Sequence, residues 1–217
     1  MISIITVLGS PHRHGNTEKL LDKFIDGVKE AKCNEDVYIE KVILRDLDIH
    51  PCKGCNACHK TGSCIIQDDA ITLYDKINAA NGFVMTFPIF TMSAPAEVKS
   101  VIDRAHYIWV RRFKHQSEVI SKEYKESHHA WVFSTAGMSL TKRPDLFNTV
   151  LPIMSALFNS LGYTQMQGIH ADGMDDAGGI EGRPEIMERA YQLGQNAVQE
   201  LALYSTNNTK NYDTKDI

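Results

Sequence analysis

The sequence has no long apolar run and no excess of basic residues. No stretch approaches the roughly 18 consecutive apolar residues that cross a bilayer, so no membrane-spanning helix is predicted. Lysine and arginine number 23 against 27 aspartate and glutamate residues, and the net charge of −4 argues against a general nucleic-acid-binding protein. With 43% hydrophobic and 23% charged residues, the 217-residue chain has the composition of a folded globular protein.

Cysteine is scarce outside one short segment. Four of the five cysteines lie between Cys52 and Cys64, and only Cys33 stands apart. This distribution argues against a secreted disulfide scaffold and indicates metal or redox chemistry in the reducing cytoplasm. The first apolar run, residues 2–8, is short and has no basic residues before it. It is therefore interpreted as a buried strand rather than a signal peptide, and a cytoplasmic location is expected.

Short β-branched runs alternate with amphipathic helical patterns along the chain. This alternation predicts an α/β protein with a parallel sheet covered by helices on both faces. The expected single domain is 1–204, followed by a polar C-terminal tail at 205–217. The predicted strands are 2–8, 37–44, 82–87, 130–134 and 163–169. The predicted helices begin near 16 and 68 and cover 96–107, 144–161 and 181–204.

The loop after the first strand, residues 9–17, leads directly into a helix. A helix N-terminus offers unpaired N–H groups and partial positive charge, which suit a phosphate. The loop lacks the dinucleotide fingerprint, and Asn16 stands where a Walker lysine would be, so a phosphomonoester fits better than a nucleoside triphosphate. An ordinary capped loop is the alternative. The candidate phosphate-binding residues are Ser10, His12, Arg13, Gly15, Asn16 and Thr17.

The loops after the third and fourth strands belong to the same sheet edge, where parallel sheets bind their ligands. The third loop is apolar and aromatic, so it can lie against a flat ring, or it can simply pack into the core. The fourth loop has small residues that let the backbone approach a ring, although alone it has little specificity. The candidate residues are Pro88, Ile89, Phe90, Thr91 and Met92, then Ser134, Thr135, Ala136 and Gly137.

The cysteine segment, 51–66, is the most specific motif. Three thiols at two-residue gaps can face one iron–sulfur cubane, and a fourth thiol can close it. The four candidate ligands are Cys52, Cys55, Cys58 and Cys64. Structural zinc more often takes two separated cysteine pairs, so the regular triple spacing suits it less. Empty or oxidised thiols remain the other interpretation.

The segments 9–17, 51–69, 88–104 and 134–137 together resemble the flavodoxin-like NAD(P)H-dependent FMN reductase superfamily, most of all its iron–sulfur flavoprotein branch. The resemblance implies a flavodoxin-like three-layer sandwich with a five-stranded parallel sheet of order 2-1-3-4-5. It also implies that 88–92 contact the isoalloxazine ring and that 134–137 lie at its pyrimidine side. Relatives usually have arginine at position 12 and often glycine at position 92, where this chain has His12 and Met92.

The resemblance implies an FMN-dependent NAD(P)H oxidoreductase in which the flavin, rather than a catalytic side chain, carries the chemistry. NADH or NADPH would be the co-substrate, and a 4Fe–4S cluster on the four cysteines would be a second redox centre. A homodimer or homotetramer is expected, with each cysteine loop reaching a neighbouring flavin. The alternatives are an electron carrier that works with ferredoxin without nicotinamide turnover, and a thiol or metal sensor. The acidic loop 172–181 is interpreted as a solvated loop.

Overall fold

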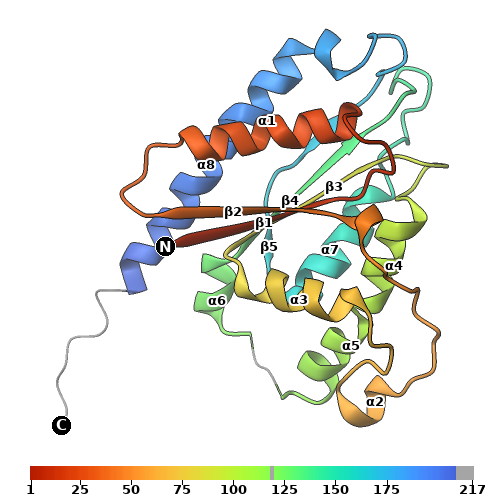
Figure 1. The fold of residues 1–217 in the computed structure, drawn as a ribbon, viewed down its shortest axis with the longest axis vertical. Coiled ribbons are helices and arrows are strands. Elements are labelled where there is room, and N and C mark those ends of the chain that lie inside the picture. The colour runs from red at the N-terminus through yellow and green to blue at the C-terminus, as the bar shows by residue number, and fades with distance from the viewer. Residues whose placement is uncertain (118–119, 209–217) are drawn as a thin grey trace.

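The computed structural model of the protein describes residues 1–117 and 120–208, and its centre is a parallel sheet (Figure 1). The strands follow the order β2-β1-β3-β4-β5, and β6 also pairs with β4. This order confirms the expected flavodoxin-like topology. The strand bounds are β1 Ile2–Leu8, β2 Val37–Ile43, β3 Gly82–Pro88, β4 His129–Thr135, β5 Thr164–Gln165 and β6 Ile169–Ala171.

The expected fifth strand is divided into β5 and β6 by a bulge at Gly168. The Met166 N–H still donates to the Ala130 carbonyl at 2.7 Å. The backbone of Gly168 then lies so close to β4 that a Cβ there would be 1.9 Å from the Val132 carbonyl oxygen. Regular pairing resumes at Ile169, opposite Phe133. The prediction of one continuous strand over 163–169 is therefore wrong.

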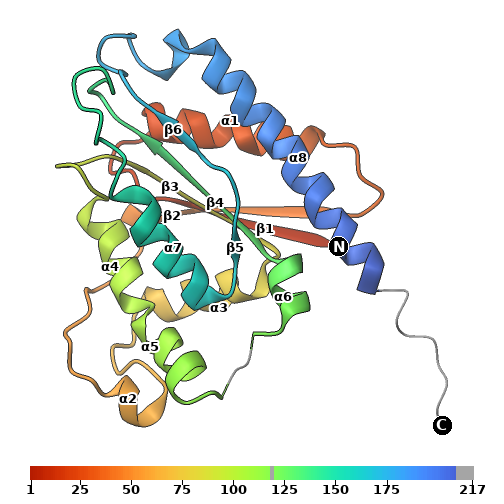
Figure 2. The same ribbon diagram turned by 180° about the vertical axis from the view of Figure 1, so that it is seen from behind.

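Helices cover both faces of the sheet (Figure 2). One face carries α1 and α8, whose apolar side chains form one core with β1 and β4. The opposite face carries α3, α4, α5 and α7, which form a second core. The helix bounds are α1 Asn16–Glu30, α2 Cys58–Thr61, α3 Asp69–Ala79, α4 Ala96–Arg104, α5 His106–Trp109, α6 Lys122–Ser127, α7 Val150–Leu161 and α8 Pro184–Asn208.

The first and last helices touch backbone to backbone through two glycines. A Cβ on Gly27 would lie 2.0 Å from the Tyr191 carbonyl oxygen, and a Cβ on Gly194 would lie 2.1 Å from the Phe24 carbonyl oxygen. Helix α8 continues to Asn208, four residues into the expected polar tail, and 209–217 lie outside the described residues. Among the described residues no helix is both long enough and apolar enough to cross a membrane.

Two helix predictions need correction. The helix expected over 96–107 stops at Arg104, and the chain continues through α5 into a π-helical turn, Val110–Lys114. The helix expected over 144–161 begins only at Val150, after a series of turns. Pro152 is the third residue of α7, where a helix has no internal acceptor for the N–H group, so the proline fits without a bend.

Candidate functional site

A cavity of about 320 Å³ lies at the edge of the sheet where β1, β3 and β4 end. Its size falls within the usual range for small-ligand sites, and this edge is where parallel sheets bind ligands. Eleven of the fifteen predicted cofactor-binding residues line it: Ser10, His12, Gly15, Asn16, Thr17, Pro88, Ile89, Phe90, Thr135, Ala136 and Gly137. The structure thus brings three loops from distant parts of the sequence together around one space.

The N-terminus of α1 opens into this cavity. Gly15 is the residue before the helix and offers no side-chain cap, so the first amide groups of α1 have no side-chain acceptor from that position. Thr17 is buried, and its hydroxyl is 2.7 Å from the Thr135 hydroxyl. Only one proton lies in that bond, so the second hydroxyl can donate to a bound group. The Asn16 Oδ1 accepts a hydrogen bond from the Ile180 N–H at 2.9 Å.

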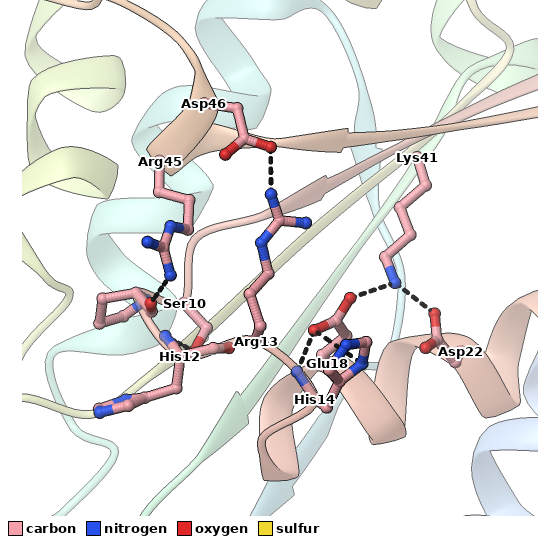
Figure 3. A network of polar contacts seen from close by, with 10 residues as sticks. Ser10, His12, Arg13, His14, Glu18, Asp22, Lys41, Arg45 and Asp46 are labelled. Carbon is pink, nitrogen blue, oxygen red and sulfur yellow. Dashed lines mark hydrogen bonds and ion pairs between the residues drawn. The ribbon is translucent and has the colours of Figure 1, made fainter.

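Arg13 does not line the cavity. Its guanidinium forms an ion pair with Asp46, while Arg45 donates to the Pro11 carbonyl (Figure 3). His12 does line the cavity, and the Ser10 hydroxyl accepts a hydrogen bond from its backbone N–H at 3.2 Å. Of the two basic residues predicted for a phosphate, the structure therefore brings only His12 to the cavity.

A buried acidic residue in the first turn of α1 is neutralised by its neighbours. Lys41 Nζ lies 2.8 Å from Glu18 Oε1 and 2.6 Å from Asp22 Oδ1 (Figure 3). Burial raises the pKa of Glu18, but hydrogen bonds from Lys41 and from the His14 N–H outweigh it, so the pKa is lowered overall. Because Lys41 compensates this carboxylate, Glu18 opposes an anion at the helix N-terminus only weakly.

The loop after β3 ends in a very tight turn. The Phe90 and Ser93 backbones exchange hydrogen bonds, both 2.9 Å long. The two residues between them have left-handed backbones, with φ of 46° at Thr91 and 63° at Met92. Glycine adopts this conformation without strain, which explains why a glycine at position 92 suits the turn. Thr91 and Met92 do not line the cavity, whereas Phe90 does and is 43% exposed.

The loop after β4 divides its residues between the cavity and the sheet interior. Thr135, Ala136 and Gly137 line the cavity. Ser134 points elsewhere: it is fully buried, and its hydroxyl is 2.7 Å from the His170 Nδ1 on β6. Adjacent residues of a strand face opposite sides of the sheet, so Ser134 and Thr135 cannot both present their side chains to one ligand.

Met174 and Asp175 also line the cavity, and sequence reasoning missed both. Their N–H groups donate to the carbonyls of Ala136 and Gly137, each at 3.1 Å, so the acidic loop is fastened to the loop after β4. The Asp175 carboxylate sits over Gly137, where a Cβ would lie 2.4 Å from its Oδ2. The interpretation of 172–181 as a merely solvated loop is therefore wrong for this part, which forms a wall of the cavity.

The residues around the cavity fit FMN. The uncapped helix N-terminus, His12 and the free hydroxyl proton of the Thr17–Thr135 pair supply donors for a phosphate. The small residues at 135–137 form one part of the lining, and Ile89 and Phe90 add an apolar wall. These features occupy different walls of one cavity, as an elongated molecule with an anionic end and a flat end requires.

The four predicted cluster ligands also come together. Cys52, Cys55, Cys58 and Cys64 line a single second cavity of about 40 Å³, and none of them forms a disulfide. Burial raises the pKa of the Cys58 thiol, and nearby negative charge on the other three thiols adds to the rise. A metal centre relieves this mutual repulsion, because its positive charge offsets the negative charge of the deprotonated sulfurs that bind it. Among the described residues that line this cavity there is no carboxylate, so the donor set fits iron–sulfur chemistry.

Two histidines lie close together beside Cys58, His59 from the cysteine segment and His106 from α5. The ring nitrogens of His59 and His106 are 3.0 Å apart, and together with the Cys58 sulfur they form a group within 4.8 Å. Such a group suits a divalent metal ion. However, the Lys114 ammonium lies 2.7 Å from the other His59 ring nitrogen and opposes a cation there. The four-thiol cavity is therefore the better metal site.

The model of the NADPH-dependent FMN reductase family matches residues 2–135. An iron–sulfur flavoprotein of Methanosarcina thermophila is 29% identical over 118 residues, which cover 54% of this chain and 60% of that protein. An iron–sulfur flavoprotein of Methanocaldococcus jannaschii is 31% identical over 104 residues, which cover 48% of this chain and 52% of that protein. The chain thus matches between about half and three fifths of the length of these relatives.

Solved structures share the fold at low identity. An azoreductase from Bacillus anthracis has a TM-score of 0.69 and 15% identity, covering 90% of this chain and 100% of that one. An NAD(P)H:quinone oxidoreductase from Methanothermobacter marburgensis has a TM-score of 0.66 and 15% identity, covering 90% of this chain and 96% of that one. The family model covers more than half of the chain and confirms the resemblance found in the sequence. The curated relatives that the chain matches are iron–sulfur flavoproteins, and the chain belongs to the NADPH-dependent FMN reductase family.

Proposed function

We propose that this protein is an FMN-dependent NAD(P)H oxidoreductase that passes hydride or electrons between a nicotinamide nucleotide, bound FMN and an acceptor. One observation carries the proposal: the uncapped N-terminus of α1 opens into a 320 Å³ cavity walled by the loops after β3 and β4. When bound, FMN supplies the ring that accepts and returns electrons. The chain itself binds and orients this ring, so no acid–base side chain is required.

The phosphate end of FMN would lie at the start of α1. Backbone N–H groups at 15–17 and the free hydroxyl proton of the Thr17–Thr135 pair would donate to its oxygens. His12 would add a donor from the opposite side of the loop. Asp175 repels an anion, so its position over Gly137 indicates that the phosphate lies away from that wall.

The ring end would lie between the loops after β3 and β4. Ile89 and Phe90 would exclude water from one side, and the backbone at 135–137 would meet the polar edge of the ring. Phe90 is 43% exposed, so this wall of the cavity faces solvent and leaves access for a nicotinamide. Four predicted residues would then influence FMN binding through the shape of the backbone and through neighbouring residues, without touching FMN by their side chains: Arg13, Thr91, Met92 and Ser134.

The four cysteines would hold a 4Fe–4S cluster that exchanges electrons with the flavin. The residues that line the cysteine cavity and those that line the FMN cavity are entirely different. Cys52 and His106 also line a larger space of about 670 Å³ beside α4, α5 and α7. This space would let a neighbouring subunit bring its flavin close, which supports a homodimer or homotetramer. Free thiols at such a site suit the reducing cytoplasm.

The absorption spectrum of anaerobically purified protein tests the proposal. Flavin bands with a broad shoulder that dithionite bleaches would support both centres. Rapid bleaching of the flavin by NADH or NADPH would support the oxidoreductase. Bleaching only through reduced ferredoxin would instead support an electron carrier without nicotinamide turnover. If added FMN produces no bound flavin, the proposal fails and a thiol or metal sensor remains.

Paired variants test whether the two sites are separate. Asn16→Ala combined with Thr17→Ala should weaken FMN binding and leave the iron content unchanged, because neither residue touches the cysteine loop. Cys55→Ala should remove iron and leave FMN bound. Bound flavin and iron per folded chain are the measurements. Loss of both cofactors from either folded variant would contradict the assignment of two separate sites.

A further inference from the structure

Arg104 is a buried arginine at the end of α4, behind the cysteine loop. Only 1% of its surface is exposed. Its Nη1 lies 2.6 Å from Asp68 Oδ2 and donates to the His50 carbonyl at 2.9 Å, and its Nη2 donates to the Ile66 carbonyl at 3.0 Å. A buried guanidinium is costly unless such partners satisfy it, so its position beneath this loop calls for a reason.

These contacts fasten the two ends of the cysteine segment together. One of the two carbonyls belongs to His50, just before the segment begins at Pro51. The other belongs to Ile66, where the segment ends. Asp68 adds a third link, because its Oδ2 also accepts the His50 N–H at 2.9 Å. The base of the loop is therefore closed by protein contacts alone, and the four thiols are gathered in advance of any metal.

One donor of Arg104 is left over. Its Nε is buried and has no hydrogen-bond partner among the described residues. Arg104 lines the same cavity as the four thiols, and of these thiols Cys64 is the one whose negative charge acts on the guanidinium of Arg104. Burial lowers the pKa of Arg104, but Asp68 and then the negative charge of Cys64 outweigh it, so the pKa is raised overall.

We propose that Arg104 is a positioning residue whose Nε–H donates to the Cys64 sulfur when that sulfur binds a cluster, and that this bond raises the cluster's reduction potential. The inference rests on the proposed function, because it assumes the four-cysteine cluster. A cluster held by four thiolates is negatively charged and gains one further negative charge on reduction. Hydrogen bonds and positive charge at the sulfurs stabilise the reduced form most.

Exposure distinguishes Arg104 from the lysines of the same loop. Lys53 also lines the cysteine cavity, but it is exposed, so water screens its charge. Arg104 acts from the buried side, where a charge and a hydrogen bond have a larger effect. Lys53→Gln is therefore a matched control that removes one positive charge from the same cavity without touching the buried donor.

The test compares Arg104→Lys, Asp68→Asn and Lys53→Gln with the wild-type protein after anaerobic cluster reconstitution. Iron, sulfide and FMN per chain are measured. The reduction potential of the cluster is measured by a redox titration followed by electron paramagnetic resonance. Arg104→Lys keeps a charge for Asp68 but loses the Nε donor. At a fixed ambient potential we expect its ratio of reduced to oxidised cluster to fall about tenfold, which is about 59 mV for one electron.

Asp68→Asn should loosen the base of the loop and, because it removes a buried negative charge beside Arg104, should not lower the potential. Lys53→Gln should shift the potential much less than Arg104→Lys. FMN content reports that each variant is folded, because the FMN cavity shares no residue with this one. An unchanged potential in Arg104→Lys overturns this inference alone, as does an equal fall of the potential in either other variant. Loss of iron from Arg104→Lys but not from Asp68→Asn supports it, and loss from both overturns it. A wild-type protein that takes up no iron overturns the proposed cluster as well.

Discussion

The hydroxyl pair between Thr17 and Thr135 offers the sharpest test of the FMN site. Both side chains are at least 97% buried, and their oxygens are 2.7 Å apart. Thr17→Val and Thr135→Val each keep the shape of the side chain but leave the partner hydroxyl buried without its bond. The double variant removes both hydroxyls, so no polar group is left unpaired.

The expected energies follow from this geometry. Each single variant should lower the free energy of unfolding by about 1–2 kcal/mol, because a buried hydroxyl loses its partner. For a chain of this length that corresponds to a fall in Tm of about 2–8 °C. The double variant should lose less than the sum, with a coupling energy of about 1–2 kcal/mol. Its affinity for FMN should nevertheless fall about tenfold or more, since no hydroxyl remains to donate to the ligand.

Urea unfolding of the FMN-free protein measures the stabilities, and quenching of FMN fluorescence measures the affinities. Thr6→Val is the control: its buried hydroxyl donates to the Glu40 carbonyl at 3.1 Å, away from the cavity. That variant should lose stability and keep its affinity for FMN. Strictly additive stability losses in the double variant, or wild-type FMN affinity, would refute this account of the pair.

Three further outcomes follow from the structure. Asp175→Asn should favour reduced over oxidised FMN by about 3–10-fold in a redox titration, because it removes a negative charge beside the ring. Asp176 lies outside the cavity, so an equal effect of Asp176→Asn would contradict this prediction. Burial raises the pKa of Asp68, but hydrogen bonds lower it overall, so its stabilising effect is present above the ordinary value of 3.8 and is lost as the pH falls further. Urea unfolding from pH 3 to 6 should therefore show the advantage over Asp68→Asn shrinking in acid, and a constant advantage would count against the ion pair. Gly27→Ala should lower the free energy of unfolding by about 1–3 kcal/mol, because its methyl would meet the Tyr191 carbonyl at 2.0 Å, and unchanged stability would disprove that contact.

Local pattern sufficed for the elements that carry their own chemical markers. Strand β1 and the start of α1 agree with the predictions because a buried β-branched run and a loop-to-helix junction are visible in the sequence. Asp68 likewise predicts the start of α3, because it is the N-cap residue and its side chain accepts a hydrogen bond from the Ala70 N–H. The bulge at Gly168 could not be predicted from the sequence, because its cause is a close approach to the Val132 carbonyl, which depends on how β4 packs in the fold.

The site divides in the same way. Positions close to a strand end, such as Thr17 and Gly137, were predictable because topology alone brings strand ends together. The direction of a side chain was not predictable in this way. Arg13 pairs with Asp46, which belongs to a neighbouring element that the local sequence does not reveal. Asp175 was missed because backbone hydrogen bonds, which any sequence can make, fasten its loop to the cavity.

The wall formed by 172–180 has a consequence for the newly made protein. The start of α1 is synthesised well before the Ile180 N–H that bonds to Asn16 and before helix α8, which covers α1. Because a chain emerges from its N-terminal side onward, the cavity stays open on one side until residues 172–180 have been made. Nascent chains that end before Asp172 should therefore fail to retain flavin, even though the loops after β1, β3 and β4 are already complete. Cofactor capture is thereby delayed until the acidic loop has been made.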